Sequence, residues 1–172
     1  YYGFDVNNKF IQFCKNNKDF ENVKFEISAY PLKDTDFVVM SGTYNLTPTN
    51  NISLWEDYII KNLTNNWKFV GKAMIFNCLL KDKKTINKSL YYTELTWIKK
   101  ICEKNFCNPE IIKHNLLKDD ITVILKKWFY CLRDIIKAFK WYENNSGSSK
   151  GIKCPHSGLS LIHISEPTRH ES

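Results

Sequence analysis

Fifteen residues at the end of the chain limit how much of its sequence can build a fold. Residues 158–172 contain the run Leu-Ile-His-Ile-Ser-Glu-Pro-Thr-Arg, which resembles the in-frame translation of a sequencing-library adapter. Segments of this kind are excluded before fold reasoning. The chain also begins with Tyr1 instead of an initiator Met. We therefore expect one truncated domain over 1–142, a flexible linker over 143–157, and a non-native tail over 158–172 that makes no packed contact.

The composition is that of a globular domain. Hydrophobic residues make up 43% of the chain and aromatic residues 15%, which excludes disorder for the main body. No apolar run approaches the ~20 residues that cross a bilayer, so we expect no transmembrane segment. The six Cys follow no compact disulfide spacing, which favours a reducing compartment. We expect a cytoplasmic or nuclear protein, and five N-x-Ser/Thr sequons keep secretion as an alternative.

Positive charge is concentrated in the later part of the chain. Residues 1–60 hold 5 basic and 8 acidic side chains, whereas residues 61–157 hold 19 basic and 8 acidic side chains. This asymmetry favours a polyanionic partner such as nucleic acid or an anionic membrane surface. Lys outnumbers Arg 23 to 2, a bias typical of AT-rich codons. A set of lysines that are only solvated is therefore the alternative interpretation.

The first fifty residues combine a short helix with two strands. Apolar spacing over 5–17 predicts a helix capped by Asp5. Strict alternation over 23–29 predicts a half-buried strand, and the apolar run 37–40 predicts a second strand. We expect these two strands to form a hairpin, which is marginal in water unless helices cover it.

From residue 51 onward the sequence predicts helices. Ser53 and Glu56 form a capping-box pattern, and Asn108-Pro109-Glu110 is typical of a helix start. The expected helices cover 53–66, 67–80 (central and buried), 89–104, 108–118 and 121–142. The predicted fold class is α+β, mainly α, with a small N-terminal β-hairpin packed against a four- to five-helix bundle.

The helix expected over 121–142 carries the candidate site. Its core stripe includes Ile121, Ile124 and Leu125. The opposite face would present basic residues for phosphate contacts and aromatic rings for base stacking. The predicted nucleic-acid-binding residues are Lys126, Tyr130, Arg133, Lys137 and Trp141. The alternative is a solvated lysine face with the Trp covered by a neighbouring element.

Metal binding and catalysis have little support in the sequence. Cys102, Cys107 and His114 have side chains suited to zinc, but no fourth ligand is evident, so we expect a buried Cys102 and no metal or cofactor. The adjacent carboxylates Asp119 and Asp120 are explained by helix capping. No Gly-rich phosphate loop is present.

These observations favour a non-catalytic, basic helical binding module that meets nucleic acid in replication or regulation. A helical protein–protein interaction scaffold is the first alternative, and a fragment of a larger enzyme is the second.

Overall fold

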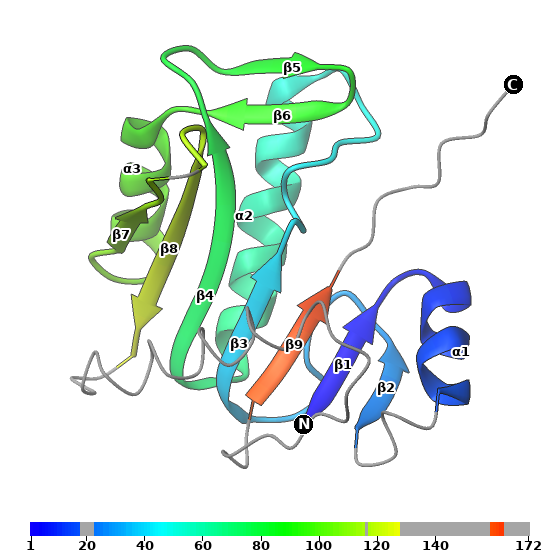
Figure 1. Ribbon diagram of the computed structural model, residues 1–172. Coiled ribbons are helices and arrows are strands. Elements are labelled where there is room, and N and C mark those ends of the chain that lie inside the picture. The colour runs from blue at the N-terminus through cyan, green and yellow to red at the C-terminus, as the bar shows by residue number, and fades with distance from the viewer. Residues whose placement is uncertain (18–22, 116, 128–158, 164–172) are drawn as a thin grey trace, which may run out of the picture.

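The computed structural model describes residues 1–17, 23–115, 117–127 and 159–163. Within these ranges the chain forms three helices and nine strands (Figure 1). In chain order they are β1 Tyr2–Asp5, α1 Asn8–Asn16, β2 Lys24–Ile27, β3 Thr35–Ser41, α2 Ile52–Lys68, β4 Val70–Leu80, β5 Thr85–Asn87, β6 Leu90–Thr93, α3 Leu95–Asn105, β7 Glu110–Lys113, β8 Asp120–Lys126 and β9 Leu159–His163.

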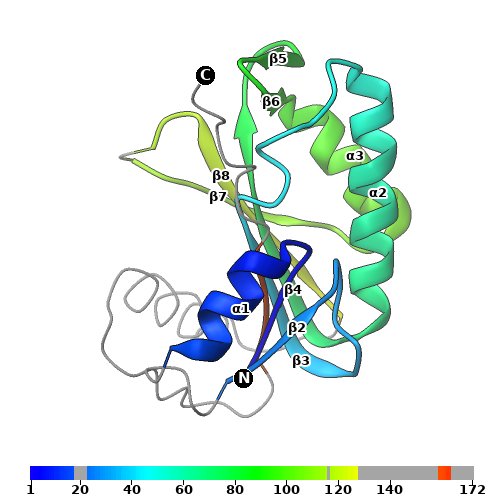
Figure 2. The same ribbon diagram turned by 90° about the vertical axis from the view of Figure 1, so that its right-hand side faces the viewer.

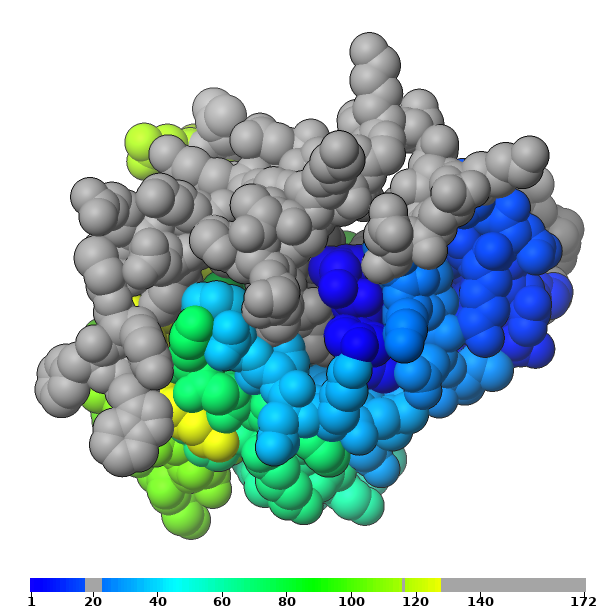
Figure 3. Space-filling model, turned by 90° about the horizontal axis from the view of Figure 1, so that it is seen from below, coloured from blue at the N-terminus to red at the C-terminus, as the bar shows by residue number. Residues whose placement is uncertain are grey.

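The strands join in one mixed sheet. Its order is β2-β1-β9-β3-β4-β6-β5, and β8 lies against β4 with β7 on its outer side. The pairs from β2 to β4 are all parallel, whereas β8 runs antiparallel to both β4 and β7. Figure 3 views the sheet from its lower end and shows the start of β4 between β3 and the end of β8.

Helices cover both faces of this sheet. The β1–α1–β2 and β3–α2–β4 units move outward in opposite directions along the sheet. Because parallel crossovers are right-handed, helices of two such units lie on opposite faces. Figure 2 shows this arrangement, with α1 on one side and α2 and α3 on the other. This is a doubly wound α/β architecture, so the predicted mainly helical α+β class is wrong.

The core lies between the sheet and the α2–α3 layer. Alternate residues of β3 and β4 join one apolar cluster with residues of α2 and α3, which is the period-2 pattern of strands. Ala73 and Ile75, on the opposite face of β4, are buried as well. The cluster includes Val38, Met40, Met74, Phe76, Ile59, Leu63 and Ile98, none of which is more than 1% exposed.

The predicted central helix over 67–80 is wrong in type but right in position. β4 pairs with β3 on one side and β8 on the other. Ala73, Met74, Ile75 and Phe76 are at most 1% exposed, so both faces of the strand are buried. Such a strand has no polar alternation, and its apolar run cannot be told from a buried helix by periodicity.

The start of the predicted long helix over 121–142 is also a strand. In β8, Ile121, Val123, Ile124 and Leu125 are at most 2% exposed. Ile124 lies opposite Ile75 of β4 in antiparallel register. The spacing of the apolar residues fits a helix equally well, because continuous burial removes the signal that separates the two periods.

Three other sequence-based predictions are corrected. The strands near 23–29 and 37–40 exist, but β2 pairs with β1 and β3 pairs with β4 and β9, so they do not form a hairpin. The helix predicted over 89–104 begins as β6 and becomes helical only in α3. The stretch 108–118 contains β7 where a helix was predicted.

Two predicted helices are confirmed. α1 falls within 5–17, although its N-cap is Asn7, whose side chain accepts a hydrogen bond from the Lys9 amide at 2.9 Å. α2 buries Trp55, Ile59 and Leu63, as their spacing predicts, whereas Tyr58, which the same spacing placed inward, is 36% exposed. Within the described residues, no helix is long and apolar enough to cross a membrane.

The tail contributes a strand to the sheet. β9 pairs in parallel with β1 and with β3, and so lies between them. The expectation that residues 158–172 make no packed contact therefore fails for Leu159–His163. The adapter-like origin of the tail stays a prediction, because backbone pairing does not depend on where a sequence came from.

Candidate functional site

The direction of the chain along the sheet reverses between β1 and β3. From β1 the chain moves outward to β2, and from β3 it moves outward to β4 on the opposite side. In open α/β sheets, ligands bind outside the carboxyl ends of the strands at such a reversal. Here those ends are Asp5 of β1 and Ser41 of β3, which places the candidate site at the upper end of the sheet in Figure 1.

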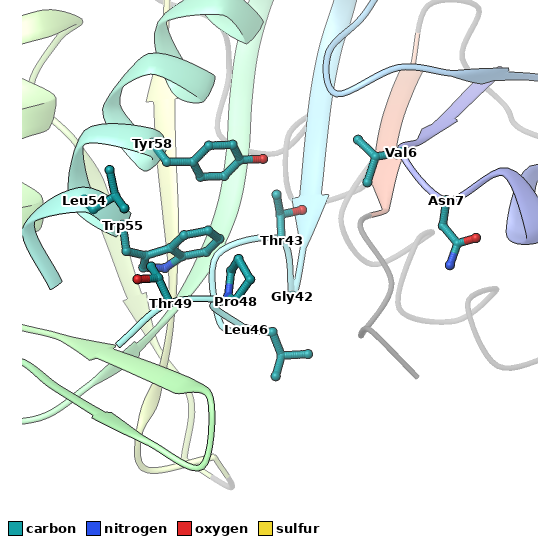
Figure 4. A pocket seen from close by; sticks show the side chains of 10 residues that line it. All are labelled: Val6, Asn7, Gly42, Thr43, Leu46, Pro48, Thr49, Leu54, Trp55 and Tyr58. Atoms are coloured by element: carbon teal, nitrogen blue, oxygen red, sulfur yellow. The ribbon is translucent and has the colours of Figure 1, made fainter. Parts of the chain in front are cut away.

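A cavity lies at this position. Its volume is ≈ 650 Å³, within the ~300–1,000 Å³ typical of small-molecule sites. Three segments form its walls: the turn after β1, the loop after β3 and the first turns of α2 (Figure 4). The described lining residues are Val6, Asn7, Gly42, Thr43, Leu46, Pro48, Thr49, Leu54, Trp55 and Tyr58, and none carries a charge.

The turn after β1 is organised by Asp5. This carboxylate is only 5% exposed, and its Oδ1 accepts a 2.6 Å hydrogen bond from the Asn7 backbone amide. Asn7 then caps α1. The prediction that Asp5 caps the helix thus missed the cap by two residues. Its actual place, at the carboxyl end of a parallel strand and next to the cavity, makes it a candidate ligand-binding group.

The loop after β3 is fixed by a side chain of β4. Gly42 has φ +71°, a left-handed conformation that glycine adopts without steric cost. Its amide donates a 2.7 Å hydrogen bond to Asn77 Oδ1. Asn77 Nδ2 in turn donates to the Asp120 carboxylate at 3.1 and 3.3 Å. Burial raises the pKa of Asp120, and the hydrogen bond from Asn77 opposes that rise.

A second network of hydrogen bonds, made by buried side chains, also fixes the loop after β3. Tyr44 is 1% exposed, and its hydroxyl donates to Asn62 Oδ1 at 2.8 Å. Asn62 Nδ2 donates to the Ala29 carbonyl at 3.0 Å, and Trp55 Nε1 donates to the Tyr44 carbonyl at 3.2 Å. Burial raises the pKa of Tyr44 well above its usual range, so the phenol remains a donor. A connected buried network of this kind makes the loop rigid before any ligand arrives.

The α2 wall is aromatic. The Trp55 and Tyr58 rings stack with centroids 4.8 Å apart and planes 15° from parallel. Trp55 is 6% exposed, whereas Tyr58 is 36% and Leu54 59% exposed. Figure 4 shows the Tyr58 hydroxyl directed away from α2 toward β3. Burial raises the pKa of Tyr58, which keeps this hydroxyl neutral.

The residues predicted to bind nucleic acid are not brought together among the described residues. Lys126 ends β8, where its ammonium group pairs with the Glu110 carboxylate at 2.6 Å. The other four, Tyr130, Arg133, Lys137 and Trp141, lie outside the described residues. Lys126, the first residue of the predicted basic helical face, therefore lies in a strand.

The predicted zinc-type residues have other environments. Cys102 is fully buried, as expected, and burial raises the pKa of its thiol to about 12. His114 Nε2 lies 2.9 Å from Thr122 Oγ1. Across the part of the chain that the structure describes, no three His, Cys, Asp or Glu side chains form a metal-binding group.

Sequence reasoning did not predict the cavity residues. One signal was available: the apolar run 37–40 is followed at once by Ser41 and Gly42, which is typical of the carboxyl end of a buried parallel strand. Asp5 follows Phe4 in the same way. If Asp5 and Ser41 are both taken as the ends of parallel strands, they are expected to lie at one edge of a sheet.

Comparisons with known proteins support the fold assignment. No protein-family model matches the sequence, and no curated protein sequence matches it. Among solved structures, the chain is similar to magnesium protoporphyrin IX methyltransferase from Synechocystis PCC 6803 with bound SAH, with a TM-score of 0.54 and 11% identity over 74% of this chain and 64% of that chain. The SAM-bound structure of that enzyme gives a TM-score of 0.50 and 11% identity over 74% of this chain and 59% of that chain.

This likeness concerns the fold, since the identity is low, and the chain spans less than two thirds of the length of either structure. It overturns the interpretation as an alpha-helical nucleic-acid-binding module and agrees better with the alternative, a fragment of a larger enzyme. The chain has a methyltransferase-like α/β fold of the Rossmann type.

Proposed function

We propose that this chain is part of a SAM-dependent methyltransferase, and that the cavity at the carboxyl ends of β1 and β3 takes SAM. One observation carries the proposal: a cavity of ligand size lies at the chain reversal of a sheet similar to that of SAM- and SAH-bound structures. The reversal point is where this architecture binds its ligands.

The residues around the cavity fit the chemistry of SAM (S-adenosylmethionine). Its ribose presents two hydroxyl donors, and a carboxylate at the end of a neighbouring strand is the usual acceptor for a ribose in Rossmann-type sheets. Asp5 holds that position at the end of β1, beside the cavity residues Val6 and Asn7. Asp5 would therefore orient the ribose.

SAM and a dinucleotide differ in what they require of the loop after a strand. Dinucleotides need a G-x-G-x-x-G turn so that backbone amides can approach their pyrophosphate. The six Gly of this chain do not form that motif, and SAM has no phosphate to bind. Binding of SAM therefore requires no such phosphate-binding turn.

When bound, SAM supplies an electrophilic methyl group on its sulfonium. The chain's own residues would hold the reactants and exclude water. The loop after β3 is immobilised through Gly42, Asn77 and Tyr44, and the wall of Leu54, Trp55 and Tyr58 is apolar. A rigid, dry site of this kind contributes to rate mainly by positioning the reacting groups.

Calorimetric titration of the full chain with SAH tests the proposal. We expect SAH to bind, and Asp5→Asn to weaken binding by about tenfold or more, because charge-assisted hydrogen bonds to the ribose are lost. Asp34→Asn is the matched control: Asp34 is exposed and precedes β3 at the opposite end of the sheet. Equal affinities for the two variants, or a folded chain that does not bind SAH at millimolar concentration, would contradict the proposal.

A further inference from the structure

The α2 side of the cavity has a composition that the proposed SAM site does not require. The ribose-binding group lies on the β1 side, at Asp5. Across the cavity, α2 and the loop before it contribute Leu46, Pro48, Leu54 and the Trp55–Tyr58 stack (Figure 4). These side chains form a wide apolar surface that faces the carboxyl end of β3.

Two hydroxyl groups stand out on this surface. Thr43 is 3% exposed, and its Oγ1 is buried without a hydrogen-bond partner among the described residues. The Tyr58 side chain is 36% exposed, and its hydroxyl is directed toward β3 (Figure 4). Native proteins pair nearly all their buried polar groups. An orphaned hydroxyl in a cavity wall is therefore a position where a ligand atom completes the bonding.

We propose that the α2 side of the cavity binds the methyl acceptor, and that this acceptor is a flat, uncharged, apolar molecule with one hydroxyl group that bonds Thr43 and Tyr58. The role of this ligand as methyl acceptor rests on the proposed function. Its chemical class is argued from the residues of the wall. The stacked rings present an aromatic surface for a planar group. The two hydroxyls can donate to and accept from a third hydroxyl.

The described wall residues are uncharged, which disfavours charged ligands. No described lining residue is ionisable except Tyr58, and burial keeps that phenol neutral. The described part of the wall offers no counter-charge to a carboxylate or an ammonium group, and desolvation of an unpaired charge is strongly unfavourable. Glu56 lies on the same helix, but its carboxylate pairs with the Lys84 ammonium group, before β5, at 2.7 Å.

Matched naphthalene probes test the ligand class. The affinities of 2-naphthol, naphthalene and 2-naphthoate for the full chain are measured by quenching of Trp fluorescence, with and without saturating SAH. We expect 2-naphthol to bind about fivefold more tightly than naphthalene because of its added hydrogen bonds. We expect 2-naphthoate to bind more than about tenfold more weakly than 2-naphthol. Equal binding of the naphthol and the naphthoate would overturn the proposal.

Variants assign the preference to the two hydroxyls. Thr43→Val and Tyr58→Phe keep the shape of each side chain, and each should reduce the preference for 2-naphthol over naphthalene. Tyr30→Phe, with a similar exposure of 37%, is the control and should leave the preference unchanged. SAH affinity is measured for the same three variants, so that an effect on the cofactor is separated from an effect on the naphthol preference.

The two proposals fail in different ways. If Thr43→Val and Tyr58→Phe weaken SAH binding as strongly as Asp5→Asn, the α2 wall belongs to the cofactor, and the acceptor proposal is wrong. If SAH does not bind at all but the naphthol preference and its loss in the variants persist, the proposed function fails while the ligand class of the wall stands. If no variant alters the preference, the hydroxyls do not select the ligand.

Discussion

The side chain of Asn77 accepts a 2.7 Å hydrogen bond from the backbone amide of Gly42. This contact crosses from the middle of β4 to the first residue after β3, at the wall of the cavity. Asn77 can hold this orientation because its Nδ2 donates to Asp120 of β8. Three strands thus determine the position of one loop amide.

Replacement of Asn77 by Leu should release that loop. The Gly42 amide and the Asp120 carboxylate would both lose a partner, and an unpaired buried polar group costs about 1–3 kcal/mol. We expect the free energy of unfolding, measured by urea denaturation, to fall by about that amount, and SAH affinity to fall with it. Unchanged stability and unchanged SAH binding would show that the Gly42 amide does not depend on Asn77.

The ionisation of Asp120 predicts a pH dependence. Its pKa is raised above 3.8, chiefly by burial, so the folded state binds the proton more tightly than the unfolded state. Ionisation of Asp120 therefore lowers the free energy of unfolding as the pH rises from about 3.8 through the pKa of the folded state. At lower pH the carboxyl is protonated in both states, and this effect disappears. Asp120→Asn should raise the thermal midpoint at pH 7 but not at pH 3.5, and the exposed neighbour variant Asp119→Asn should not. A stabilisation that is equal at both pH values would contradict this assignment.

The centre of β4 should dominate stability. Met74 is 0% and Phe76 1% exposed, and removal of a large buried side chain leaves a cavity. We expect Met74→Ala and Phe76→Ala each to cost about 2–5 kcal/mol in urea denaturation. Ile27→Ala is the control: Ile27 ends the edge strand β2 and is 55% exposed, so its cost should be within about 0.5 kcal/mol. A neutral result for both β4 variants would mean that this strand is not the core.

The tail can be tested by truncation. β9 supplies the backbone hydrogen bonds that join β1 to β3, so removal of residues 158–172 should lower the thermal midpoint. Removal of 164–172 alone keeps β9 and serves as the control. An unchanged midpoint after the longer deletion would mean that the strand does not pair in solution, as its adapter-like sequence would predict.

The sequence predicted the helices better than the strands, for a physical reason. α1 and α2 each have one apolar face, a cap and a polar face. Their helical period can therefore be recognised from the residues of the helix alone. β4 and β8 are covered on both faces by elements that the local pattern does not contain, so their continuous apolar runs carry no period of two. The predicted helix over 67–80 and the start of the predicted helix over 121–142 were wrong for this reason.

The site was harder to predict than the fold. Its lining joins Val6 and Asn7 to Thr43 and to Trp55 and Tyr58, which lie on three separate segments. Only parallel pairing between distant strands brings the ends of β1 and β3 together, and short strands such as Tyr2–Asp5 give a weak alternation signal. Asp5 was therefore interpreted as the helix cap, whereas the cap of α1 is Asn7.

A crystal structure of the full chain with SAH would test the central claim most directly. We expect the nucleoside at the carboxyl ends of β1 and β3, with a ribose hydroxyl within about 3.2 Å of the Asp5 carboxylate and the ligand alongside Gly42. We also expect the surface of Thr43 and Tyr58 to remain open beside the ligand. SAH bound elsewhere on the chain, or bound in the cavity with Asp5 uninvolved, would contradict the account.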